Sequence, residues 1–366
     1  MSEEHPVATA GARRLLSWFD RHRRDLPWRR DGDPYRVWLS EIMLQQTRVE
    51  TVIPFYEAFL ARFPTVNDLA EAPIEAVLAA WSGLGYYRRA RQLHRAAQEV
   101  AAAGGRFPET VENLLGLPGI GPYTAAAIAS ICFGVAVPVL DGNVERVLAR
   151  RQAEEGDAKS AAVRRRFVSA ASDLLDPARA GDSNQAMMEL GATICVPKNP
   201  RCLLCPLTEG CRALALGATD LYPKARREKR SEEVSIVAVL VEDEKRRILL
   251  FRRPDDSTLL AGLWEVPWVE AAAKETASEL ARRYGGSWRL GAQVGTARHG
   301  ITYRDITVAV HLGEVGGGEE IREGPEAGWF GAEEIGNLAT SSLVGKILSA
   351  RQKEAVKPRR SIRPRG

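Results

Sequence analysis

Four of the five cysteines stand within one short segment. Cys195, Cys202, Cys205 and Cys211 follow the pattern Cys-x6-Cys-x2-Cys-x5-Cys. Thiolates gathered so closely are typical of a metal site, because soft sulfur ligands favour both zinc and iron–sulfur clusters. The unequal loops favour an iron–sulfur cluster over a zinc ribbon, in which two Cys-x2-Cys pairs usually lie far apart. We therefore expect a metal centre here, with zinc as the alternative to iron–sulfur.

Two disulfides are another use of the same four thiols. Five cysteines in 366 residues, with no secretory leader after Met1, indicate a reducing compartment, where disulfides are rare. The fifth thiol, Cys132, lies in an apolar run and is expected to be a small buried hydrophobic residue. We expect metal binding and a cytoplasmic location.

Two carboxylates lie on or before expected helices. Asp33 followed by Pro34 predicts a helix start, and Glu41 lies on that helix in line with apolar neighbours. A desolvated Glu41 would have a raised pKa and could hold a proton near neutral pH, as a general acid must. The helical phase alone favours a solvated position at the edge of the apolar stripe. Asp141 precedes a second helix, where a plain N-cap would also use aspartate.

A glycine-rich turn precedes a third helical run. The segment Leu117-Pro118-Gly119-Ile120-Gly121 is followed by apolar and small residues from Tyr123 onward. Glycines let a ligand approach the backbone, and the N–H groups at a helix start can donate to a phosphate. The pattern is typical of a helix-hairpin-helix motif, which binds one DNA strand through its backbone without reading bases. Many helical hairpins use glycine only to turn.

Periodicity divides the chain into two domains. Apolar residues recur at helical spacing from residue 8 to about 220, and an alternation of period two begins at 233. We expect a helical domain over 1–221 that includes the cysteine loop 195–211, a basic linker over 222–232, a strand-containing domain over 233–352 and a basic tail over 353–366. The net charge of +4 is concentrated in the linker and tail, which suits a polyanionic partner. No apolar run approaches the ~20 residues of a spanning helix, so we expect no membrane partner.

In chain order, these segments resemble one family, the adenine DNA glycosylases (MutY). The resemblance rests on Trp38 to Thr47, Leu84-Gly85-Tyr86-Tyr87, the glycine turn, Leu140 to Val144 and the cysteine loop. It implies an α + β multidomain protein. An all-α, two-lobed helix-hairpin-helix glycosylase domain with a [4Fe–4S] cluster loop would be followed by an α/β Nudix-like domain, to which Leu260 to Pro267 are similar. By this resemblance the metal centre is the [4Fe–4S] cluster rather than zinc.

The resemblance also implies the reaction. The partner would be double-stranded DNA that holds adenine opposite 8-oxoguanine or guanine, and the enzyme would hydrolyse the N-glycosidic bond of a flipped-out adenine. Glu41 would protonate N7 of adenine and ionised Asp141 would stabilise the sugar cation, while Tyr123 and Asn143 orient the pair. The other implied site residues are the adenine pocket of Arg24, Leu26, Trp28, Arg29 and Gln185, the DNA wedge of Gln46 and Tyr86, the hairpin residues Leu117, Gly119 and Gly121, and the cluster ligands Cys195, Cys202, Cys205 and Cys211.

Endonuclease III-like enzymes are the related alternative. They carry a lysine shortly after the hairpin glycines, and its amine supports strand cleavage through a Schiff base. This chain has Tyr123 at the matching position, and a phenol cannot form an imine. We expect a monofunctional glycosylase that leaves an abasic site and acts as a monomer. A noncatalytic iron–sulfur DNA-binding protein is disfavoured because both candidate carboxylates are present.

The Nudix resemblance raises nucleotide pyrophosphohydrolysis as a competing function. Such hydrolysis needs a clustered Arg-Glu-x-x-Glu-Glu motif whose carboxylates hold divalent metal. The helix expected at 271–284 offers only Glu275 and Glu279. We therefore expect this domain to recognise a base rather than hydrolyse a nucleotide.

The loop expected to recognise 8-oxoguanine departs from the family pattern. The family commonly reads His-x-Phe-Ser-His, whereas this chain reads His299-Gly300-Ile301-Thr302-Tyr303. Thr302 keeps a hydroxyl that could bond the lesion, while Tyr303 replaces the terminal histidine. The difference predicts a softer preference for 8-oxoguanine over guanine.

Overall fold

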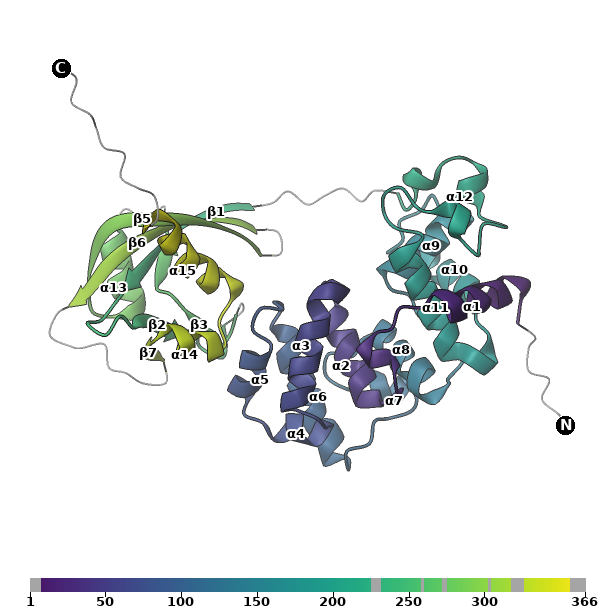
Figure 1. Cartoon of the computed structure of the whole chain (residues 1–366), viewed down its shortest axis with the longest axis horizontal. Coiled ribbons are helices and arrows are strands. Elements are labelled where there is room, and N and C mark those ends of the chain that lie inside the picture. Colours follow the sequence, from purple (N-terminus) through teal and green to yellow (C-terminus); the bar gives the residue numbers. More distant parts are fainter. Residues whose placement is uncertain are drawn as a thin grey trace, which may run out of the picture. The chain divides into compact units, whose positions relative to one another are not determined.

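The computed structural model describes residues 8–224, 232–257, 260–271, 275–301, 304–316 and 326–355. Contacts between residues divide the chain into two units (Figure 1). The first unit comprises Met1–Glu71 and Gln92–Arg227, and the second comprises Ala72–Arg91 and Glu228–Gly366. Residues 72–91 thus group with the second unit, although we expected the first domain to run unbroken over 1–221. The domain boundaries stay a prediction.

The first unit is helical. Its helices start at residues suited to cap them: the Asp33 side chain accepts from the Arg36 N–H, and the Asp141 side chain accepts from the Val144 N–H. The α-helices are α1 (Ala10–His22), α2 (Pro34–Leu44), α3 (Val49–Arg62), α4 (Val66–Glu71), α6 (Arg88–Ala102, which begins in the second unit), α7 (Val111–Leu115), α8 (Pro122–Phe133), α9 (Gly142–Gln152), α10 (Ala161–Ser172), α11 (Ala180–Thr193) and α12 (Arg212–Ala215). Short 3-10 turns are η1 (Pro27–Arg29), η2 (Pro177–Arg179), η3 (Cys202–Leu204) and η4 (Thr219–Leu221).

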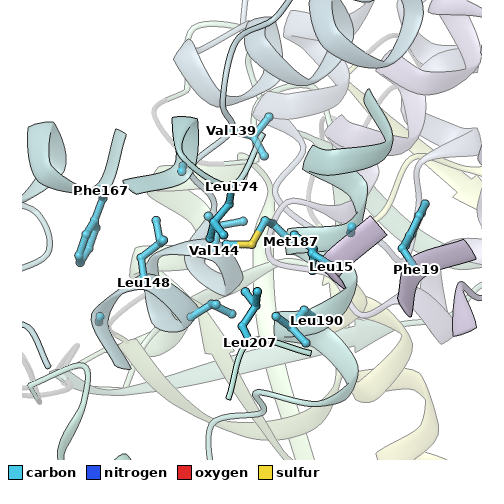
Figure 2. Close-up of a cluster of buried hydrophobic side chains, with 14 of the residues drawn as sticks. Leu15, Phe19, Val139, Val144, Leu148, Phe167, Leu174, Met187, Leu190 and Leu207 are labelled. Atoms are coloured by element: carbon cyan, nitrogen blue, oxygen red, sulfur yellow. The ribbon is translucent and has the colours of Figure 1, made fainter. Parts of the chain in front are cut away.

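One apolar core joins distant parts of this unit. Figure 2 shows side chains of α1, α9, α10 and α11 converging with Leu207 of the cysteine loop. Val139 and Val144 of this core flank Asp141 in sequence, and Met187 and Leu190 belong to α11. Burial of such side chains is the main stabilising contribution to a fold of this kind. The core therefore fixes the backbone before and after Asp141.

The described residues of the second unit form two sheets. A four-stranded mixed sheet has the order β4-β1-β6-β5, with β1 and β6 parallel, and a three-stranded antiparallel sheet has the order β3-β2-β7. The strands are β1 (Glu232–Val241), β2 (Ile248–Arg252), β3 (Trp264–Glu265), β4 (Trp268–Glu270), β5 (Ser287–Ile301), β6 (Arg304–Gly316) and β7 (Ala327–Phe330). The helices are α5 (Ile74–Ala80), α13 (Thr276–Tyr284), α14 (Ala332–Asn337) and α15 (Ser342–Ala355).

The alternation of β1 explains the helices on both faces of this unit. Ile236 and Leu240 belong to one buried cluster with Ile347 of α15, whereas Val239 belongs to another with Leu280 of α13. Successive side chains of a strand point to opposite faces, so each face needs its own covering layer. No helix within the described ranges is long and apolar enough to cross a bilayer.

Gly191 permits the close contact of α11 with the start of α9. A Cβ atom at Gly191 would lie 2.6 Å from the Asn143 Cβ and 3.0 Å from the Asn143 carbonyl oxygen. We expect Gly191→Ala to lower the free energy of unfolding by about 1–3 kcal/mol, because overpacking forces the helices apart. Chemical denaturation measures this change. Gly142→Ala is the matched control, since a Cβ there meets nothing within 4 Å; equal stability of the two variants would contradict the explanation.

Candidate active site and cysteine loop

A cavity of about 1050 Å³ opens in the first unit. Its wall is built from η1, α2, the glycine turn before α8, the start of α9, and α11. A hollow of this size is large enough to enclose a base-sized ligand. The residues expected from the sequence that line it are Arg24, Leu26, Trp28, Arg29, Glu41, Gln46, Gly119, Gly121, Tyr123, Asp141, Asn143 and Gln185.

Glu41 is buried, with 6% of its surface exposed. The solvated position favoured by helical phase is wrong, because α2 is buried from Tyr35 through Met43 with Arg36 as the exception and offers no solvent-facing stripe at Glu41. The Tyr123 hydroxyl lies 2.5 Å from Glu41 Oε2 and donates to it. Burial raises the pKa of Glu41 to about 7, although the Tyr123 bond and the charge of Arg29 oppose the rise. This carboxyl can therefore hold a proton near neutral pH.

Asp141 has a more polar setting than Glu41. Its Oδ1 accepts from the Val144 N–H at 2.7 Å, and its Oδ2 accepts from the Asn143 amide at 3.1 Å. Burial raises the pKa of Asp141 above its ordinary value, while these two bonds oppose the rise by favouring the carboxylate. Asp141 is both the N-cap of α9 and a wall of the cavity, so the plain capping role and the site role are compatible.

Two arginines of α9 join the start of that helix to the cysteine loop. Arg146 donates to the Asn143 side-chain oxygen at 2.8 Å and to the Cys195 carbonyl at 2.8 Å. Arg150 is buried and donates to the carbonyls of Val196 at 2.7 Å and Tyr222 at 3.0 Å. These bonds hold the start of the cysteine loop, and Tyr222 beyond its end, against α9.

The four cysteines of the loop line one small cavity of about 30 Å³. All five cysteines are free thiols, so the two-disulfide alternative is not observed. Nη1 of Arg150 lies 3.3 Å from the Cys195 sulfur. Across the described ranges, no three Cys, His, Asp or Glu side chains stand close enough to hold a metal ion between them. The donor set is four soft sulfurs around a shared cavity, and such ligands suit zinc as well as an iron–sulfur cluster.

Sequence reasoning missed Glu189. It lies on α11, and its side chain is fully buried. Its carboxylate accepts from Nε of Arg24 at 2.7 Å and from Nη2 of Arg29 at 2.9 Å. The signal was available, because Glu189 follows Gln185 by four residues and so shares its helix face.

The glycine turn lies against α6. Gly119 has a φ of +77°, and a Cβ there would lie 2.6 Å from the Gln92 Cβ, so both the turn and the close approach require glycine. Gly121 is the N-cap of α8, and Leu117 lies half-buried in the turn, where its carbonyl accepts from the Ile120 N–H at 3.2 Å.

The residues expected to form the DNA wedge and to recognise the lesion are divided between the two units. Gln46, at a φ of +60°, is exposed at the cavity, and Tyr86, at a φ of +50°, is exposed in the second unit. His299 lies on β5 with its Nδ1 3.3 Å from the Lys346 ammonium. Burial and that ammonium lower the pKa of His299. Thr302 and Tyr303 lie outside the described residues.

Two acidic residues of the second unit are bound by arginines, whereas Glu275 at the start of α13 accepts from the Ser278 hydroxyl at 2.9 Å. Glu265 accepts from Arg253 at 2.9 Å and from Arg283 at 3.1 Å. Glu279 of α13 is ion-paired with Arg282. Carboxylates neutralised in this way are poor ligands for a divalent metal, because the cations compete with it.

The chain is similar to known proteins along most of its length. Residues 39–171 match the HhH-GPD superfamily base excision DNA repair protein model, and residues 236–350 match the NUDIX domain model. The human protein called adenine DNA glycosylase is 38% identical over 92% of this chain and 73% of its own length, and the mouse protein of that name is 37% identical over 93% and 77%. The structure of a thermostable thymine-DNA glycosylase covers 56% of this chain and 95% of its own, with a TM-score of 0.52 and 28% identity. The expected order of a helical domain and a Nudix-like domain is confirmed.

Burial of Glu41 makes stability depend on pH. A pKa raised from 4.5 to about 7 means that the folded state binds this proton more tightly than the unfolded state does. The resulting stability is fully present below the ordinary pKa of 4.5 and is lost as pH rises through about 7. Glu41→Gln has no carboxyl group to titrate and so does not lose this stability. The free energy of unfolding of Glu41→Gln, minus that of the wild type, should therefore rise by up to about 3 kcal/mol from pH 4.5 to pH 8.

Denaturant titrations at pH 5 and pH 8 measure this gain. Glu57→Gln, which removes a carboxylate from an exposed position of α3, controls for the change of net charge. A gap between Glu41→Gln and the wild type that stays constant with pH would show that Glu41 does not titrate in this range.

Proposed function

Because the chain belongs to the adenine DNA glycosylase family, we propose that it excises adenine mispaired with 8-oxoguanine or guanine in double-stranded DNA. It does so as a monofunctional glycosylase that leaves an abasic site. The observation that carries this proposal is the pair of carboxyl groups in one cavity, of which Glu41 is desolvated and Asp141 is bonded by N–H donors. Groups that differ in this way can act as acid and as charged stabiliser in one reaction.

The proposed mechanism begins with protonation of the base. Adenine leaves poorly as an anion, so the neutral Glu41 carboxyl gives its proton to N7 as the bond to the sugar breaks. The sugar becomes an oxocarbenium-like cation, which the Asp141 carboxylate stabilises. Tyr123 holds Glu41 in place through its hydroxyl, and Asn143 holds Asp141. Water then adds to the sugar carbon and gives a proton to the Glu41 carboxylate, which restores the neutral acid.

The cavity receives the base after it leaves the duplex. Arg24, Leu26, Trp28, Arg29 and Gln185 form the adenine pocket, and Gln46 and Tyr86 fill the vacated stack. The exposed positions of Gln46 and Tyr86, both at positive φ, suit an insertion role. Leu117, Gly119 and Gly121 hold the DNA backbone, since N–H groups at a glycine turn and helix start can donate to a phosphate.

Strand cleavage by a Schiff base is not part of this proposal. It needs a neutral amine at the sugar, and Tyr123 supplies a phenol instead. A lysine that lines the cavity, Lys159, lies 2.8 Å from Glu145 and is ion-paired with it. The Lys159 nitrogen is thus held by a carboxylate.

The second domain, over residues 233–352, recognises the base opposite adenine. Nucleotide hydrolysis is disfavoured because Glu265 and Glu279 are bound by arginines. We assign lesion recognition to His299, Thr302 and Tyr303, and expect a modest preference for 8-oxoguanine because Tyr303 replaces the family's histidine.

Cys195, Cys202, Cys205 and Cys211 hold a [4Fe–4S] cluster. The shared cavity of the four thiols and the membership of the family support this assignment. Bound there, the cluster would supply a structural link that ties the loop together through four Fe–S bonds. Arg150 would donate to the Cys195 thiolate, as its position 3.3 Å from that sulfur allows.

The reaction is tested on three duplexes, with adenine opposite 8-oxoguanine, guanine or thymine, each incubated with enzyme and analysed with and without alkali. We expect strand cleavage only after alkali. It should be most extensive for adenine opposite 8-oxoguanine, less for adenine opposite guanine and least for adenine opposite thymine. Glu41→Gln should lower the single-turnover rate constant by at least about 100-fold, because the proton donor is gone, while DNA binding persists. Alkali-independent nicks would overturn the monofunctional assignment, and normal turnover by Glu41→Gln would overturn the acid.

The cluster is tested by iron content and visible absorbance of the purified protein. We expect about four irons per chain in the wild type and a large loss in Cys202→Ala, since three thiolates hold the cluster less well. Cys132→Ala is the matched control, because this half-buried thiol lies on α8, outside the loop. Zinc in place of iron in the wild type, or full iron content in Cys202→Ala, would overturn the assignment.

A further inference from the structure

Glu189 is the buried anion beneath the wall that carries Arg24 and Arg29. Its two oxygens accept from Nε of Arg24 at 2.7 Å, from Nη2 of Arg24 at 3.0 Å and from Nη2 of Arg29 at 2.9 Å. Its Oε1 also lies 3.3 Å from the backbone N of Arg24. One carboxylate of α11 therefore fixes two side chains and one backbone group of a segment about 160 residues earlier in the chain.

The segment that carries these arginines has little regular structure of its own. Between the end of α1 at His22 and the start of α2 at Pro34, only the three residues of η1 are helical. Arg29 also donates to the Arg24 carbonyl at 3.3 Å and lies over the Phe19 ring at 5.6 Å. A free arginine side chain has many rotamers, and bidentate binding to a carboxylate selects one. Without Glu189 the two guanidinium groups would lose their shared anchor.

The group has an unequal charge balance, with two cations on one anion. Burial alone would raise the pKa of Glu189, but the two arginines outweigh burial and hold the pKa below its ordinary value. Glu189 is therefore charged at neutral pH, and the group carries a net charge of +1. Removal of the Glu189 charge would leave two uncompensated cations in the wall.

The charge of this wall acts on Glu41. The groups that influence Glu41 are Tyr123 of α8, Asp141 at the start of α9, and Arg29 of η1, whose charge favours the ionised form. Arg48 and Glu50, beside and within the start of α3, line the same cavity. Among these groups, as far as the structure describes them, Arg29 is the one that is bonded to Glu189.

We propose that Glu189 is a positioning residue for adenine excision, which fixes Arg24 and Arg29 as one wall of the pocket and limits the positive charge acting on Glu41. The inference rests on the proposed function, because it takes Glu41 as the general acid. Two effects follow from the two parts of the proposal. Loss of the anchor should slow the reaction, and loss of the negative charge should make Glu41 release its proton at lower pH.

The test is the pH profile of single-turnover adenine excision from a duplex with adenine opposite 8-oxoguanine. The wild-type rate constant should fall on the alkaline side as Glu41 ionises. Glu189→Gln should move this alkaline limb to lower pH by about 0.5 to 1 unit and lower the maximal rate constant about tenfold or more. The shift distinguishes a charge effect from a general loss of structure, which would lower the rate constant at every pH alike.

Two further variants separate charge from position. Glu189→Asp keeps the charge but shortens the side chain, so it should lower the rate constant and leave the limb in place. Asp182→Asn makes the same carboxylate-to-amide change on the first turn of α11, where Asp182 pairs with Arg179 at the surface, away from the cavity. Asp182→Asn should match the wild type in both rate constant and limb.

A second background is used if Glu189→Gln does not fold. In Arg24→Gln, the wall retains Arg29 paired with Glu189, and addition of Glu189→Gln leaves Arg29 alone. The limb should again move to lower pH between these two proteins. An unmoved limb in whichever comparison folds would overturn the inference while the proposed function stands. Wild-type protein that leaves adenine in place would overturn both.

Discussion

Exclusion of water from the Glu41 carboxyl is the condition on which the rest of the site depends. Glu41 lies on a helix that is buried along nearly its whole length, and only 6% of its surface is exposed where it lines the cavity. A buried carboxyl is costly unless it is neutral or bonded, and here a single phenol supplies the bond. The surrounding apolar core offsets this cost. Because burial raises its pKa to about 7, the carboxyl group keeps its proton near neutral pH.

Three carboxylates near one cavity differ because their donors differ. Glu41 has one hydroxyl donor, Asp141 has a backbone N–H and an amide, and Glu189 has two guanidinium groups. A donor that favours the anion lowers the pKa of the carboxyl group and so opposes the rise that burial causes. The three therefore differ in how readily they ionise, Glu41 and Glu189 being buried and Asp141 half-buried. The contrast arises from partners rather than from the carboxylates themselves.

Sequence patterns predicted the order of elements well, because capping residues and period-two alternation are local signals. Asp33 and Asp141 cap helices as expected, and the alternation of β1 divides its side chains between two buried clusters. Burial of Glu41 was not predictable from helical phase, because a helix packed on all sides has no phase to read. Glu189 shares a helix face with Gln185, but its partners are about 160 residues away, so the ion pairs themselves are not a local signal.

The packing of α1 on α11 has a consequence for synthesis of the chain. Leu15 and Phe19 of α1 are fully buried in the core that includes Met187 and Leu190 of α11. Arg24 and Glu189 are 165 residues apart, so at ribosomal rates of about 5–20 residues per second the first helix waits roughly 8 to 30 s for its partner. During that interval the part of α1 that packs on α11 has no partner on the nascent chain. Within the first unit, α1 therefore completes its packing only after α11 has been made.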